Sequence, residues 1–189
     1  MYFTDDYYLI RRKILKLLGG AFHIYNAQQQ VVGYSELKAF KLKEDIRLYT
    51  DETMSQEIFS IKARNILDIA ATYDITDSST GQIIGAARRR GLKSMLRDEW
   101  ALLAPGDREI GIITEDSVAL ALVRRLLTNL VPQNYDCKID GRQVCEFRQN
   151  FNPFVMKINV HFHDPDPQHR MLVMAAGILL CAIEGKQSS

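Results

Sequence analysis

The stretch RMLVMAAGILLCAIEG, Arg170 to Gly185, decides the fold of this chain. Its apolar run from Met171 to Ile183 is 13 residues long and leaves no polar face at helical spacing. A helix that is apolar all round is either surrounded by protein or placed in lipid. At about 1.5 Å per residue such a helix spans about 20 Å, short of the roughly 30 Å hydrocarbon core of a bilayer. We therefore expect a helix buried inside the rest of the fold.

The residues beside this stretch suit a buried helix. Asp164-Pro165-Asp166-Pro167 forms a rigid approach, because proline is well tolerated at the start of a helix, and Gly185 is placed for a C-terminal cap. Within the helix, Ala175, Ala176 and Gly177 make one section slim, so that surrounding backbone can come close. A closed set of strands around a central helix satisfies these features, because each strand contributes one inward face and closure removes the sheet edges.

Most of the remaining chain is predicted as short strands at a spacing of about 10 residues, which fits antiparallel hairpins rather than β-α-β units. Three hairpins share a pattern: FHIYNAQQQVVG, YDITDSSTGQIIG and WALLAPGDREIG. Each opens with an aromatic residue and closes with an aliphatic residue and a glycine, and YDCKIDGRQVCE is a looser fourth copy without the glycine. We expect the aromatic side chain to pack inward and the glycine to allow a bend or a close backbone approach. Chance similarity among hairpins is the alternative.

One further segment, SVALALVRRLLTNLVP, is predicted as an amphipathic helix from Ser117 to Val131. Ser117 can serve as the N-cap, and Pro132 ends the segment. Its leucine and valine stripe is expected to pack on the protein's own sheet, with a membrane surface as the alternative.

The composition limits the classes of ligand and the cellular locations to be considered. The 24 basic and 23 acidic residues nearly balance, so no global charge favours nucleic acid. No stretch reaches the roughly 18 to 20 apolar residues of a spanning helix, and the N-terminus shows no secretory signal. An odd count of three cysteines then indicates a reducing, cytoplasmic location. With Asp140-Gly141 as a two-residue turn, Cys137 would oppose Val144 and Cys145 would point to the other face, so no disulfide is expected.

Two motifs carry a resemblance to a known family. The run YDITDSSTGQIIGAARRR…RDEWALL…REIGIIT is similar to the paired hairpins of the tubby-like superfamily, in the branch that contains phospholipid scramblases and plant LURP-one-related proteins. The final VHFHDPDPQHRMLVMAAGILLCAIEG resembles the scramblase ending of a strand, an Asp-x-Asp pair and a hydrophobic helix. The resemblance covers residues 8–186. It implies one mainly β (α+β) domain over residues 1–189, a closed barrel of about twelve antiparallel strands threaded by the C-terminal helix.

The chain also departs from scramblases. Their Pro-rich N-terminal region and Cys-rich lipidation stretch are missing from this sequence. Their acidic calcium-binding segment precedes the helix, and here only Asp164 and Asp166 stand in that place.

The densest basic cluster is the best candidate ligand site in the sequence. Several guanidinium groups at a strand end can converge on a phosphate, which arginine binds bidentately. A solvated loop balanced by Asp98 and Glu99 is the alternative. The cluster consists of Arg88, Arg89, Arg90, Lys93 and Arg97.

A weaker candidate is a metal site at His161, His163, Asp164 and Asp166. Residues two apart on a strand share a face, so both imidazoles can meet one ion. Calcium prefers about six to eight oxygen ligands, more than two aspartates supply. Strand-end polar residues followed by a turn into the helix are the alternative.

No catalytic motif stands out, so we expect a protein that is not an enzyme and needs no cofactor. The resemblance and the basic cluster favour a cytoplasmic binding module, peripheral to a membrane, for an anionic phospholipid headgroup or a phosphorylated ligand. A protein–protein interaction module without a small ligand is the alternative. A membrane-inserted scramblase is the weakest option, because the apolar helix is short. Neither nucleic acid nor a transmembrane segment is expected.

Overall fold

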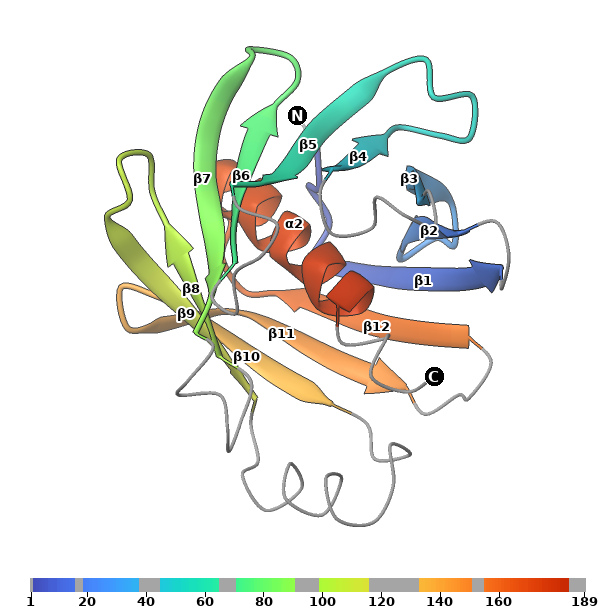
Figure 1. Ribbon diagram of the computed structural model, residues 1–189. Coiled ribbons are helices and arrows are strands. Elements are labelled where there is room, and N and C mark those ends of the chain that lie inside the picture. Colours follow the sequence, from blue (N-terminus) through green and yellow to red (C-terminus); the bar gives the residue numbers. More distant parts are fainter. Residues whose placement is uncertain are drawn as a thin grey trace.

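The computed structural model describes residues 2–15, 19–37, 45–64, 71–90, 99–115, 133–150 and 155–183. Within these ranges twelve antiparallel strands close into a barrel, and helix α2 runs through it (Figure 1). Each strand pairs with its neighbours in chain order, and β1 pairs with β12 to close the barrel. The elements are β1 Tyr7–Leu15, β2 Gly19–Asn26, β3 Val31–Leu37, β4 Asp45–Tyr49, β5 Glu57–Ala63, β6 Thr72–Asp77, β7 Gln82–Arg89, β8 Glu99–Leu103, β9 Glu109–Glu115, β10 Asn134–Ile139, β11 Arg142–Asn150, β12 Val155–Phe162 and α2 Pro167–Ile183.

The predicted closed barrel around a buried C-terminal helix is therefore confirmed. Every residue of α2 from Leu172 to Ala182 is buried, and the helix begins at Pro167 as its sequence indicates. The amphipathic helix expected over 117–131 lies outside the described residues. Across the described ranges, no helix is long and apolar enough to cross a bilayer.

A buried arginine holds each end of α2. Arg12 of β1 donates to the carbonyl oxygens of Cys181 (3.0 Å) and Ala182 (3.3 Å) at the C-terminal end. At the other end, Arg170 donates to the carbonyl oxygens of Asp164 (2.6 Å) and Asp5 (2.5 Å). These contacts tie strand β1 to the last turn of the helix and the N-terminal segment to its first turn.

The repeated hairpins pack as their sequences predict. The opening aromatic residues Phe22, Tyr73 and Trp100 are all buried. In the return strands, a Cβ atom on Gly85 would lie 2.5 Å from the carbonyl oxygen of Leu103. A Cβ atom on Gly111 would lie 2.5 Å from a carbonyl oxygen of β10. The close backbone approach expected at the repeat glycines is therefore present at Gly85 and Gly111, whereas a Cβ atom on Gly33 would meet the side chain of Ile24, at 3.1 Å.

Each of these three hairpins also contains a bulge just before its glycine. The extra residue in the return strand is Val32, Ile84 or Ile110, which the partner strand skips. The same register shift recurs at Ile58 in β5 and at Val144 in β11. Such bulges bend a strand and increase its twist, which barrel closure requires. The first four extra residues, at positions 32, 58, 84 and 110, recur every 26 residues.

The bulge at Val144 corrects the expected cysteine geometry. Ile139 opposes Arg142 across the turn as predicted, but the register then shifts and Cys137 opposes Cys145 instead of Val144. The predicted opposite orientation of the two thiols is therefore wrong, because directly paired residues share a face. Both cysteines are buried, and they form no disulfide.

Candidate metal centre

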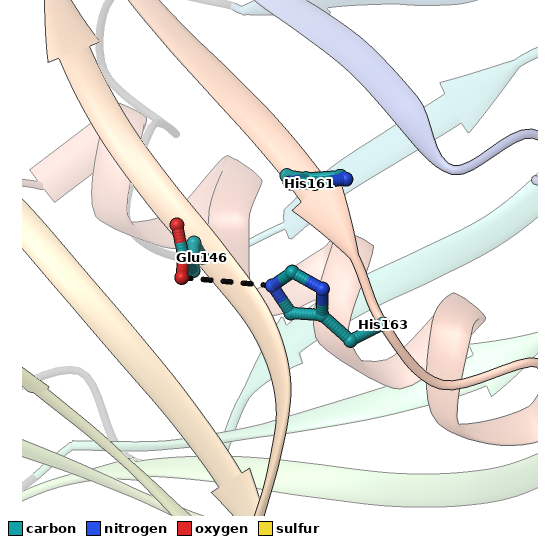
Figure 2. Close-up of side chains that lie close together, drawn as sticks. All are labelled: Glu146, His161 and His163. Atoms are coloured by element: carbon teal, nitrogen blue, oxygen red, sulfur yellow. Dashed lines mark ion pairs between the residues drawn. The ribbon is translucent and has the colours of Figure 1, made fainter.

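Glu146, His161 and His163 come together on the outer face of the barrel (Figure 2). One ligand atom from each residue lies within 4.8 Å of the other two. Glu146 projects outward from β11 because its neighbours Cys145 and Phe147 are buried in the core. In the β11–β12 ladder, Glu146 stands directly opposite His161.

The Val144 bulge holds His163 beside this pair. The carbonyl oxygen of Val144 accepts hydrogen bonds from the backbone N–H of His163 (2.8 Å) and from that of Asp164 (3.3 Å). These bonds extend the pairing with β11 beyond Phe162, the last residue of β12. His163 therefore stays in the extended course of the strand and lies on the same face as His161, two residues away.

The spacing of the three side chains is close to that of a metal site. The Nε2 atom of His163 lies 3.6 Å from Oε1 of Glu146, and the two imidazole centroids are 4.5 Å apart. In a tetrahedral site with bonds of about 2.0–2.1 Å, ligand atoms are about 3.3 Å apart. Both histidines are exposed, so small side-chain rotations can close the remaining gap.

Two neighbours orient the carboxylate of Glu146. Gln143 donates from Nε2 to Oε1 at 2.7 Å, and Nη2 of Arg148 lies 3.2 Å from Oε2. Arg148 also forms an ion pair with Asp136 at 2.8 Å, which balances its charge beside the site. Such outer contacts fix the geometry of metal-binding carboxylates in proteins.

The two predicted aspartates do not join the histidines. Oδ2 of Asp164 lies 2.8 Å from Nδ1 of His169, and its Oδ1 accepts the backbone N–H of Asp166. The carbonyl oxygen of Asp166 accepts the N–H of Arg170. Both residues thus belong to the turn that leads into α2, which was the alternative interpretation.

An open depression of about 530 Å³ adjoins the cluster. His163 and Gln143 border both features, so any ligand in the depression would lie beside the three side chains. The other polar residues that line it are Asp140, Arg142, Asp164, Asp166 and His169.

Of the predicted arginines, Arg88 and Arg90 share a face, and acidic side chains lie close to both. Arg88 donates to the Thr72 hydroxyl at 3.1 Å and lies 3.8 Å from Asp107. Arg90 forms ion pairs with two carboxylates, those of Glu99 and Glu109.

The third arginine of the run, Arg89, pairs with the buried Trp100 and shares its face of the sheet. Strand alternation therefore separates Arg89 from its two neighbours. Lys93 and Arg97 lie outside the described residues.

Sequence reasoning missed Glu146. Its position opposite His161 follows from the register of two strands that are separated by the segment 151–154. The signal in the sequence is the outward position of Glu146 between two apolar residues, but many exposed acids share that pattern.

Comparison with known proteins gives no matching family model, no matching curated protein and no matching solved structure. The resemblance to the tubby-like superfamily therefore stays a prediction.

Proposed function

We propose that this protein is a non-catalytic binding module that holds a divalent transition-metal ion at Glu146, His161 and His163. The observation that supports the proposal is the convergence of three ligand atoms within 4.8 Å. Imidazole combined with carboxylate suits zinc, copper, nickel and iron. Calcium and magnesium prefer sites built from oxygen atoms alone.

The filled interior of the barrel favours a ligand site on its outer surface. Barrels of other proteins hold a small ligand inside when side chains do not fill them. Here α2 fills the interior, and its residues Leu172 to Ala182 are buried. The outer face is therefore the surface left for a ligand. Catalytic sites are typically enclosed clefts, whereas both histidines of this cluster are exposed to solvent.

Binding of an anionic headgroup or phosphorylated ligand at the basic cluster stays a further proposal. Arg88 retains an exposed guanidinium, which supports it. An anion at Arg90 would have to displace Glu99 and Glu109, so the metal site has the stronger support.

The metal site is tested by titrating the reduced protein with Zn²⁺ in a calorimeter and with Co²⁺ by visible absorption. We expect one ion per chain. His161→Ala and His163→Ala should each weaken binding by more than about 10-fold, since even outer-shell changes typically cost about 10–100-fold.

The matched control is His23→Ala. His23 lies 2.7 Å from Glu52, so it forms a His–carboxylate pair elsewhere on the barrel. This variant should bind zinc as the wild type does. An unchanged zinc affinity in the His161→Ala/His163→Ala double variant would refute the proposal.

A further inference from the structure

We infer that the outer face of strands β2, β3 and β4 carries a second ligand site, which binds the quaternary ammonium group of a soluble small molecule. The site lies apart from the proposed metal centre, because β1 separates β2 from β12, the strand that carries His161. Its side chains are four aromatic rings and two carboxylates, those of His23, Tyr25, Tyr34, Tyr49, Glu36 and Glu52.

Strand pairing brings three of the aromatic residues into one row on the outer face. His23 lies between Phe22 and Ile24, which are both buried, so its side chain points away from the core. Tyr34 stands directly opposite His23 in the β2–β3 ladder. Tyr49 stands directly opposite Tyr34 in the β3–β4 ladder. Because directly paired residues share a face, the row crosses three strands.

Ring contacts join His23 to two tyrosines. The centroids of the His23 and Tyr34 rings are 5.1 Å apart, and the two planes are inclined by 65°. Tyr25, two residues from His23 on the same face, stacks beside it at 6.1 Å with an angle of 24°. All three tyrosines of the site are half-buried and remain partly accessible to solvent. Several rings inclined to one another form the aromatic cages that recognise quaternary ammonium groups.

Two carboxylates give these rings a negative surrounding. Oε1 of Glu52 lies 2.7 Å from Nε2 of His23, which holds the acid beside the rings. Partial burial raises the pKa of Tyr34, and the charges of Glu36 and Glu52 raise it further. Both acids therefore lie within electrostatic range of the Tyr34 ring. Within the described ranges, neither of them forms an ion pair with an arginine or a lysine.

The chemistry of the site favours an organic cation. An anion, including the phosphate of a phosphocholine lipid headgroup, would meet the two carboxylates. A metal ion would find one imidazole and one adjacent carboxylate, fewer than the three protein ligands that hold catalytic zinc. A primary ammonium group would have to give up hydrogen bonds to water. A quaternary ammonium group has no N–H donor, so its methyl groups can lie against the rings while the acids balance its charge.

The test follows choline binding by NMR of the histidine and tyrosine ring signals, with neohexyl alcohol as the uncharged analogue of similar shape. Choline should shift the ring signals of His23 and Tyr34 with a Kd in the millimolar range, because cation–π contacts at exposed sites are weak. The alcohol should bind at least about 5-fold more weakly. Equal shifts with both probes, or no shift with choline, would overturn the inference.

Two substitutions separate the contribution of the rings from that of the charge. Tyr34→Leu should weaken choline binding at least about 5-fold, because it removes a π face. Glu52→Gln keeps the side-chain shape and should weaken binding about 2- to 3-fold, as for an exposed charge. The matched control is Tyr7→Leu, since Tyr7 is 39% exposed on β1 and bonds to Asn159. It should bind choline as the wild type does, and an equal loss in Tyr7→Leu and Tyr34→Leu would contradict a defined site.

Phosphatidylcholine vesicles present the same ammonium group on a membrane surface. The protein should not co-sediment with them, because the headgroup phosphate would face Glu36 and Glu52. Co-sedimentation that Tyr34→Leu abolishes would overturn the assignment to a soluble ligand.

Discussion

Gly177 of α2 faces the side chain of Phe147, a core residue of strand β11. A Cβ atom at this position would lie 2.6 Å from Cε1 of Phe147 and 3.3 Å from Cδ1 of Ile10. The sequence predicted a slim section of helix here, but the close neighbours are core side chains rather than backbone. A packed core resists added methyl groups, because displaced side chains leave their preferred rotamers.

We predict that Gly177→Ala destabilises the protein. Overpacking costs about 1–3 kcal/mol, and the higher helix propensity of alanine returns up to about 1 kcal/mol. The free energy of unfolding in urea should therefore fall by up to about 2 kcal/mol. Phe147→Leu in the same background should recover part of the loss by making room. An increase in stability for Gly177→Ala alone would contradict the packing shown here.

The cysteines and Glu146 show which single-residue features a sequence can predict. Whether a strand side chain points into or out of the barrel follows from the alternation of side chains along the strand. The burial of Phe22, Tyr73 and Trp100 was therefore predicted correctly. The residue that stands opposite is harder to predict, because one bulge shifts the register and exchanges every partner beyond it. The bulge at Val144 is the reason that the partner of Cys137 was predicted wrongly. Glu146 was not recognised beside His161 because that pairing depends on the register of β12 against β11, two strands separated by the segment 151–154.

At the scale of the elements, α2 has no basic residue in its last turn. Its carbonyl groups there meet Arg12 from β1 instead, which supplies positive charge where the helix dipole is negative. The guanidinium also lies over the ring of Phe22, 5.8 Å from its centroid. An arginine from a strand thus performs the capping that the helix sequence lacks.

Replacing this arginine tests the cap. Arg12→Met keeps much of the side-chain volume but leaves buried carbonyl oxygens without a donor, which should lower the free energy of unfolding by about 1.5–3 kcal/mol. Arg11→Met is the matched control, since Arg11 is exposed on the opposite face. It should change stability by less than about 0.5 kcal/mol. Equal effects of the two substitutions in thermal and urea unfolding would rule out a special role for Arg12.

For the whole molecule, the apolar run and the hairpin spacing were sufficient to predict the barrel and its central helix. The inference succeeded because a helix with no polar face has few places to lie. The metal cluster was harder to predict, since it depends on the register between β11 and β12. One of its histidines also lies beyond the end of β12.

Removing the helix should abolish the fold. A chain that ends at Asp166 exposes the inward faces of all twelve strands to water. The burial free energy lost in this way exceeds the small net free energy of unfolding that stabilises most domains. Trp100, the one tryptophan of the sequence and 1% exposed, reports the change. We expect red-shifted fluorescence and no cooperative melting transition for the truncated chain. A native emission spectrum with a sharp transition would show that the barrel holds together without its helix.

The order of the elements bears on biosynthesis. The ribosome makes α2 after every strand of the barrel. The nascent chain therefore emerges as a series of hairpins whose apolar faces still lack the helix against which they pack. Domains usually fold as units while synthesis proceeds, but this one must wait for its central segment. Until then its exposed strands are open to aggregation or to capture by chaperones. A translation stop upstream of Pro167 therefore yields material for degradation and no smaller working barrel.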